Sequence, residues 1–311
     1  MKERAQELGA DLVGIASAAI VQQHPAPGGA GGPCDILKGA RSVVVLARRL
    51  LWGMGRELDP ANRNVHYAGE MILSSLEEVS YQIVRFLEDG GFPSIMTPTA
   101  YSRSHQTDLA AKALSLAHLA VEAGLGTLGL NLQLLTPEFG PRVALSAVVT
   151  TAELEPDRRR EEALCRGEEC GRCLLACPGD AVGHFALDVE RCRPHSSPYG
   201  YHFLQRHVER ILAEEDPKER LEAVRSTDTL MIWQSMLRGV GIYSGCTRCY
   251  DVCPVGADYA AHLEDVQETI AETTPAKEAR LGTLARARRN GTASATLAAN
   301  ARWIGRLPGP P

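Results

Sequence analysis

A cysteine repeat in the second half of the chain constrains the fold most. Two segments share the spacing C-x2-C-x3-C-P: Cys170, Cys173, Cys177 and Pro178 form the first, and Cys246, Cys249, Cys253 and Pro254 form the second. Two further cysteines, Cys165 and Cys192, lie on either side of the first segment. Four thiolates hold one four-iron four-sulfur cluster, so these eight cysteines predict two clusters.

The order of the cysteines predicts how the two clusters share them. In bacterial ferredoxins the last cysteine of such a run ligates the other cluster. The same rule assigns cluster 1 to Cys165, Cys170, Cys173 and Cys253, and cluster 2 to Cys177, Cys192, Cys246 and Cys249. Structural zinc is the alternative, since two C-x2-C pairs also suit it. The C-x3-C-P endings are not needed for zinc and favour clusters.

Composition bounds the remaining possibilities. The chain has 311 residues, enough for two domains, and 44% of them are hydrophobic, as in ordinary globular proteins. A formal net charge of -5 gives no chain-wide attraction for nucleic acid. We find no signal sequence and no run of about 18 apolar residues, so we expect a cytoplasmic protein without a membrane span. In that reducing compartment clustered cysteines indicate metal ligands, and the isolated Cys34 receives no role.

The pattern along the chain predicts three parts. Residues 1–158 are expected to form an α/β domain, residues 159–260 a ferredoxin-like domain, and residues 261–311 a helical basic tail. Apolar runs predict strands at Leu12–Ala16, Ser42–Ala47 and Val143–Thr150. The glycine-rich residues 24–33 read as a loop.

Helices are expected at 68–87, where apolar residues recur every three or four positions, and at about 107–123. Gly124 should end the second helix by taking a left-handed conformation. The charge run DRRREE at 157–162 is interpreted as a solvated linker at the domain boundary.

Two segments ahead of the cysteines resemble a known superfamily. EAGLGTLG, which starts at Glu122, and LTPEFGPRVAL, which starts at Leu135, look like the sequence that precedes the clusters in reductive dehalogenases. Together with the cysteine repeat, they resemble the corrinoid iron–sulfur reductases, which comprise reductive dehalogenases and epoxyqueuosine reductases.

The resemblance implies a nitroreductase-like first domain that binds cobalamin close to one cluster. The residues it points to as corrinoid-binding are Gly124, Gly126, Gly129, Asn131 and Arg142. Glycines would let backbone amides approach a bulky macrocycle, and Arg142 could supply positive charge or be an ordinary surface residue. That charge matters because Leu130 stands where the superfamily often has a lysine or arginine.

The resemblance also points to two candidate proton donors. Tyr67 matches the position of a dehalogenase tyrosine, and it could equally be a half-buried tyrosine at a helix start. Epoxyqueuosine reductases use an aspartate in a D-S-A-P sequence, which this chain lacks. Asp108 is the nearest candidate, although it could instead cap a helix.

These features favour a cobalamin-dependent iron–sulfur reductase. An external ferredoxin or flavodoxin would feed the clusters, and the substrate would be a small organohalide or a modified transfer RNA. The alternative is an electron-transfer protein without a corrinoid, whose first domain binds a partner or a flavin. The basic tail, with seven Lys or Arg residues from Lys277 to Arg306, could contact RNA phosphate or form a solvated helix.

Overall fold

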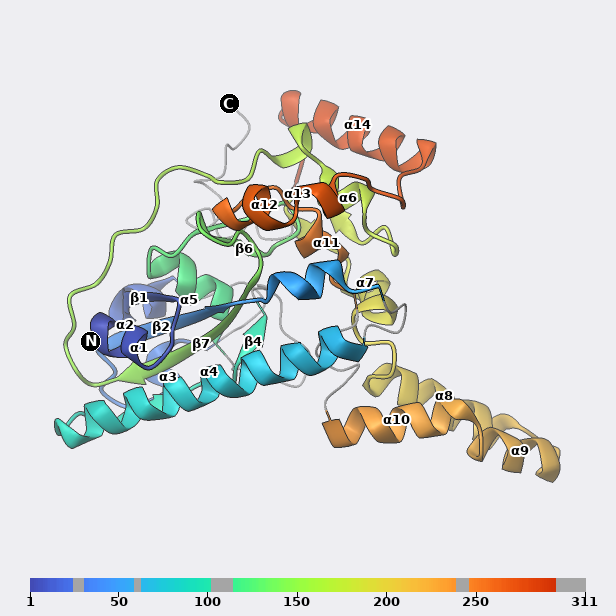
Figure 1. Ribbon diagram of the computed structural model, residues 1–311, viewed down its shortest axis with the longest axis horizontal. Helices are drawn as coiled ribbons and strands as arrows, with labels where there is room; N and C mark the ends of the chain where they lie inside the picture. Colours follow the sequence, from blue (N-terminus) through green and yellow to red (C-terminus); the bar gives the residue numbers. More distant parts are fainter. Residues whose placement is uncertain (25–30, 59–62, 102–113, 239–245, 295–311) are drawn as a thin grey trace.

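The computed structural model describes residues 1–24, 31–58, 63–101, 114–238 and 246–294 (Figure 1). It is a mixed α/β structure with a central antiparallel sheet in the first half of the chain. The sheet strands are β1 (Leu12–Ser17), β2 (Ser42–Arg49), β3 (Ser94–Met96), β4 (Ala100–Tyr101) and β7 (Val143–Thr150). Their order is β1-β2-β7-β3, and β4 also pairs with β7.

Both faces of this sheet are covered. Alternate residues of β2 point to opposite sides, so Val44 and Leu46 pack in one core while Val43 and Val45 pack in another. The long helix α4 (Arg63–Asp89) covers the first face with side chains such as Leu76. Helices α2 (Ala18–Gln23) and α5 (Leu116–Glu122) cover the second. Burial on both faces explains why these strands are continuous apolar runs.

Most of the predicted elements are confirmed, with shifted ends. The three expected strands correspond to β1, β2 and β7, and the helix expected at 68–87 lies within α4. The helix expected at 107–123 begins later in the described residues, at Leu116, because Ser115 has an extended backbone. Gly124 follows it with φ of +75°, as predicted. Three short helices complete this half: α1 (Lys2–Glu7), α3 (Pro33–Ile36), which contains Cys34, and the 3-10 helix η1 (Trp52–Arg56).

An extended segment, residues 151–166, leaves the sheet and runs along the first domain to the cysteines (Figure 1). The interpretation of its charge run as a solvated linker holds for Arg158, Glu161 and Glu162, which are exposed, and is wrong for Asp157 and Arg159. Arg159 forms an ion pair with Glu122 at 3.0 Å, and both side chains are buried. Asp157 accepts the backbone N–H of Ile15 and pairs with Lys2. The charges therefore fasten this segment to the first domain.

The second half of the chain consists of short elements around the cysteines. The two-stranded ribbon of β5 (Thr127–Leu128) and β6 (Leu134–Leu135) lies earlier, before β7. The elements between β7 and a lobe of three helices are η3 (Gly167–Glu169), α6 (Arg172–Leu175), β8 (Val182–Gly183), β9 (Ala186–Leu187) and α7 (Val189–Ser196). After it come α11 (Arg248–Asp251), α12 (Ala257–His262), α13 (Glu264–Gln267) and α14 (Pro275–Arg289). No helix in the described ranges combines the length and apolarity needed to cross a membrane.

Two helical parts frame the cysteine region (Figure 1). Helices α8 (Tyr201–Ala213), α9 (Pro217–Val224) and α10 (Thr227–Arg238) form a lobe that projects from the body between the two halves of the repeat. Helix α14, from the predicted basic tail, packs on α6 and η3. Its apolar side chains Leu281 and Leu284 join a small core that also contains Leu130 and Phe185.

Candidate metal centre

Cys173 lies at the middle of the first group of thiols. Burial raises the pKa of its thiol well above the ordinary value, and negative charge on the neighbouring cysteines raises it further. Those neighbours are Cys165, Cys253, Cys249 and Cys170. Burial likewise raises the pKa of Cys253 to about 12; the Val255 N–H and the charge of Arg142 oppose this, while Cys165 and Cys170 add to it. Thiols from both copies of the repeat therefore meet here.

A second group of thiols surrounds Cys246. Burial raises the pKa of this thiol to about 11, and the backbone N–H of Arg248 partly offsets the effect. Charges on Cys177 and Cys192, then on Asp251, raise the pKa further. This group also draws on both copies, since Cys177 belongs to the first and Cys246 to the second.

The surroundings of the sulfurs fit clusters. Buried thiolates that repel one another need positive charge between them, and iron supplies it. Backbone N–H groups of Leu130 and Gly167 lie 3.3 Å from the Cys165 sulfur, and that of Ala181 lies 3.2 Å from the Cys177 sulfur. Among the described residues, no group of three or more His, Cys, Asp or Glu side chains has the geometry to bind a single metal ion. A cluster spreads its thiolates over four irons instead.

The TPEFGPRV segment forms a turn that docks against the loop after Cys253. Thr136 and Gly140 pair in an isolated bridge. The backbone N–H groups of Ala257 and Asp258 donate to the carbonyls of Pro137 and Glu138, at 2.9 and 3.0 Å. The segment that carries much of the sequence resemblance is thus an interface between the first domain and the cysteine region.

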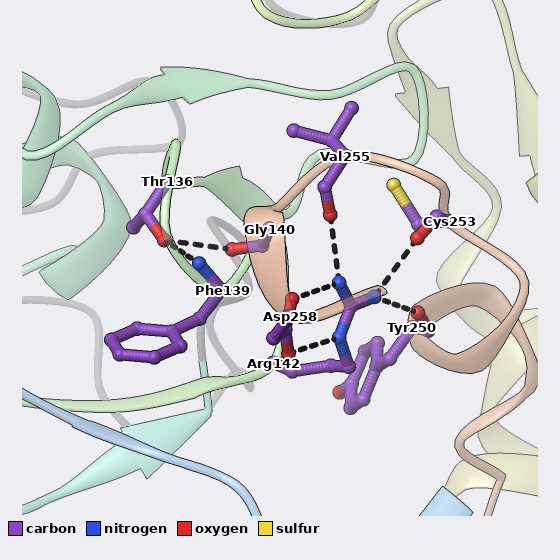
Figure 2. A network of polar contacts seen from close by, with 8 residues as sticks. All are labelled: Thr136, Phe139, Gly140, Arg142, Tyr250, Cys253, Val255 and Asp258. Carbon is purple, nitrogen blue, oxygen red and sulfur yellow. Dashed lines mark hydrogen bonds and ion pairs between the residues drawn. The ribbon is translucent and has the colours of Figure 1, made fainter. Parts of the chain in front are cut away.

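Arg142 is at the centre of that interface (Figure 2). Its guanidinium pairs with both carboxylate oxygens of Asp258, at 2.6 and 2.9 Å. It also donates to three carbonyls, those of Tyr250, Cys253 and Val255, at 2.7 to 3.0 Å. An arginine has five N–H donors, and all five are used here. The expected role in binding a cofactor or anion is therefore not supported, because the charge is committed to the Cys253 loop.

The glycine run is also occupied by protein contacts. A Cβ on Gly124 would collide with the carbonyl of Arg158, and one on Gly126 with that of Leu135. At Gly129 a Cβ would lie 3.0 Å from the side-chain oxygen of Asn131. These positions need glycine for packing within the chain, which differs from the expected approach of a macrocycle.

Asn131 and Leu130 link the same run to the cysteines. Asn131 is buried, and its amide donates to the carbonyl of Cys249 at 3.3 Å. Leu130 is buried in the small core beside α14, so an apolar side chain suits the position where the superfamily often has a cation. The run therefore connects the first domain to both copies of the repeat.

The two proton-donor candidates are not brought together with the cysteines by any described contact. Tyr67 lies near the start of α4 and is 57% exposed. Asp108 lies outside the described residues. His66, which directly precedes Tyr67, is buried, and burial lowers its pKa below the ordinary value. The role of Tyr67 and that of Asp108 stay predictions.

Two charged residues beside the cysteines were missed in the sequence. Lys277 is buried and donates to the carbonyls of Leu175 and Cys177, at 3.1 and 2.8 Å. Lys277 lies four residues before Leu281 and seven before Leu284, which places all three on one helix face. This spacing could have predicted from the sequence that Lys277 faces the core. Asp258 gave no such signal, because its partner Arg142 is 116 residues away.

A third missed residue, Asp251, lies within the second repeat. Burial raises the pKa of its carboxyl to about 6, although the Thr247 hydroxyl and the charges of Arg248 and Arg142 oppose this. It lines a small pocket between η1 and α11, together with Trp52. The pocket joins the first domain to the second repeat.

Comparisons with known proteins return two kinds of reductase. A tetrachloroethene reductive dehalogenase from Desulfitobacterium hafniense is 34% identical over 133 residues, 40% of this chain and 22% of the relative. An epoxyqueuosine reductase from Synechococcus sp. (strain RCC307) is 29% identical over 147 residues, 47% of this chain and 36% of the relative. The chain thus spans about a fifth to a third of these relatives' lengths, and no family model matches it.

Solved structures give the same two groups over most of the chain. A selenomethionine-labelled epoxyqueuosine reductase covers 89% of this chain and 68% of its own, with a TM-score of 0.52 and 20% identity. A reductive dehalogenase described with a mechanism for B12-dependent dehalogenation covers 93% of this chain and 36% of its own, with a TM-score of 0.50 and 16% identity. At these identities the likeness establishes the fold.

Proposed function

Because the chain is related to the corrinoid iron–sulfur reductases, the superfamily of reductive dehalogenases and epoxyqueuosine reductases, we propose that it is an oxidoreductase. It passes electrons from an external ferredoxin or flavodoxin through two [4Fe-4S] clusters to cobalamin and reduces an organic substrate. The reaction is reductive dehalogenation or the deoxygenation of an epoxide, as the relatives' names indicate. The protein works in the cytoplasm.

The arrangement of the thiols carries this proposal. Cys173 is influenced by Cys253, and Cys246 by Cys177, so each group contains a cysteine from the other copy of the repeat. This supports the exchange of Cys177 and Cys253 between the two sets. The sets we propose are Cys165, Cys170, Cys173 and Cys253 for cluster 1, and Cys177, Cys192, Cys246 and Cys249 for cluster 2, with Cys249 assigned by the ferredoxin rule alone. Each bound cluster would accept and release one electron at a time. The protein donates backbone N–H groups to the sulfurs of Cys165 and Cys177.

The place of cobalamin rests on the relatives. Arg142 has no donor left for it, and Gly124 and Gly126 pack against the chain's own carbonyls. The nitroreductase-like character of residues 1–158, the ferredoxin-like character of residues 159–260 and the proton donor, Tyr67 or Asp108, belong to the same proposal. The second candidate is an electron-transfer protein whose first domain binds a partner or flavin. It is favoured because Arg142, Gly124 and Gly126 already contact other parts of the chain.

One reconstitution separates the two candidates. The chain is loaded anaerobically with iron, sulfide and hydroxocobalamin, passed through a desalting column, and analysed for iron, sulfide, cobalt and zinc. We expect about eight irons and a matching amount of sulfide per chain, with one cobalt retained. Eight irons without cobalt would favour the electron-transfer protein. Zinc without sulfide would overturn both.

The substrate follows from a second measurement on the loaded protein. Chloride release from tetrachloroethene tests dehalogenation, and conversion of an epoxyqueuosine-containing transfer RNA tests deoxygenation. If RNA is the substrate, binding should weaken steeply as salt rises. On α14, Arg280 and Arg288 donate to the chain's own carbonyls, which leaves Arg286 and Arg289 exposed for such a contact.

A further inference from the structure

We propose that Arg142 and Lys277 are matched positioning residues, one for each cluster. Each places a buried positive charge on the backbone of the cysteine that is exchanged between the repeats, and each raises the reduction potential of the cluster which that cysteine ligates. This inference rests on the two-cluster part of the proposed function and is independent of cobalamin.

The first half of the pair is Arg142 at Cys253. Nη1 of Arg142 lies 2.9 Å from the carbonyl oxygen of Cys253. Figure 2 shows that oxygen facing the guanidinium, with the sulfur directed away from it. The arginine directly precedes β7, so the first domain supplies the charge.

The second half is Lys277 at Cys177. Its Nζ lies 2.8 Å from the carbonyl oxygen of Cys177, and the side chain is 10% exposed. Cys177 occupies the same place in the first copy of the repeat as Cys253 does in the second. The lysine comes from α14, which follows the cysteine repeat in the sequence, whereas the arginine precedes it. Two unrelated elements thus deliver a cation to equivalent points of the repeat.

Electrostatics gives these contacts a consequence beyond holding the loop. A cluster with four thiolates gains one negative charge when an external donor reduces it. A nearby positive charge in a poorly solvated site stabilises the reduced state more than the oxidised state. Hydrogen bonding and charge around a cluster are among the factors that set its potential.

Asp258 provides an internal test of sign. Its carboxylate pairs with Arg142 and partly cancels the positive charge. Removing the arginine charge should make cluster 1 harder to reduce, whereas removing the aspartate charge should make it easier. Residues that only shape the loop would not give opposite shifts.

The experiment is a redox titration of the reconstituted full-length protein, followed by electron paramagnetic resonance of the reduced clusters. We expect Arg142→Gln to move one of the two midpoints to a more negative potential, and Lys277→Gln to move the other. Asp258→Asn should shift the Arg142-sensitive midpoint the opposite way. Arg142→Lys and Lys277→Arg retain the charge and should leave both midpoints near those of the wild type.

Two variants serve as matched controls. Arg286→Gln removes an exposed charge from α14 whose side chain donates to the Thr283 hydroxyl of the same helix. Arg56→Gln removes a contact from the first domain to Asp265 and the carbonyl of His262, without touching a cysteine. Both should leave the midpoints unchanged.

The outcomes separate this inference from the proposed function. Unchanged midpoints in Gln variants that carry full iron, or a shift of the same midpoint by both, would overturn the pairing. If Arg142→Gln does not take up iron and sulfide, Asp258→Asn still tests the direction of the shift in midpoint potential, and Lys277→Gln still tests whether the two residues act on different clusters. A wild-type chain that binds no iron and sulfide would instead overturn the two-cluster function itself.

Discussion

The central sheet and the cysteine region of this chain are stabilised in different ways. Strands β2 and β7 pair over eight residues, and all of β7 is buried. By contrast, α6 and α11 have four residues each, and each contains a cysteine of the repeat, Cys173 in α6 and Cys249 in α11. An apolar core that excludes water holds the first region, whereas the second gathers groups that repel one another when they ionise.

This contrast indicates which region depends on metal. Burial raises the pKa of Cys173, Cys246 and Cys253, so ionising these thiols without a cation opposes folding. Metal binding to such ligands is part of the folding free energy. The sheet needs no metal, and the cysteine region should need it.

Removal of the clusters should have the largest effect. We expect the iron-free protein to keep slow amide hydrogen exchange in β2 and β7 and to lose protection in residues 163–196 and 246–263, because the sheet core remains while the thiols lose their cation. Hydrogen exchange with mass spectrometry on loaded and iron-free protein measures this. Equal protection of both regions in the two forms would break the comparison.

A cavity in the sheet core should give the next largest effect. Leu76 is fully buried between α4 and the sheet, so Leu76→Ala should lower the free energy of unfolding by ~2–5 kcal/mol. Denaturant titration measures the loss, and the iron content should stay unchanged. Tyr81→Ala, at a position of the same helix that is 46% exposed, should cost less than about 1 kcal/mol. Equal losses would mean that α4 is not packed as described.

A smaller effect concerns pH and the start of α4. Burial holds the pKa of His66 below its ordinary value of 6.5, so the unfolded chain takes up the proton first. Stability is therefore complete above about pH 6.5 and declines as pH falls toward the lower, folded pKa, by a fraction of ~1.4 kcal/mol per pH unit. His66→Gln should flatten the slope of stability between pH 7.5 and 5.5. An unchanged slope would exclude His66 as its source.

The sheet was the easier region to predict from the sequence. Runs such as VVVLA in β2 and VALSAVV in β7 are apolar at every or nearly every position because both faces are covered, and the periodicity of α4 marks its buried face. The first residue of α5 was harder to predict from the sequence. The helix begins after Ser115, where the backbone is extended, and composition does not encode the exact residue at which a helix starts.

The cysteines were recognisable for a different reason, since their spacing reflects the geometry of a cluster rather than a propensity. Long-range polar contacts were the part that could not be predicted. The resemblance points to Arg142 as a corrinoid-binding residue, and nothing in the sequence indicates its partner Asp258, which is 116 residues away. Composition likewise indicates a linker at Arg159 and gives no sign of its ion pair with Glu122 in α5. Charged residues show their role only when the fold brings the partner to them.

The exchange of Cys177 and Cys253 is the central claim, and single replacements of cysteines test it most directly. Each of Cys170→Ala, Cys246→Ala and Cys253→Ala is reconstituted anaerobically, and electron paramagnetic resonance records which of the two cluster signals is lost. We predict that Cys253→Ala abolishes the same signal as Cys170→Ala and spares the one lost in Cys246→Ala. Loss of one common signal in Cys253→Ala and Cys246→Ala would contradict the account.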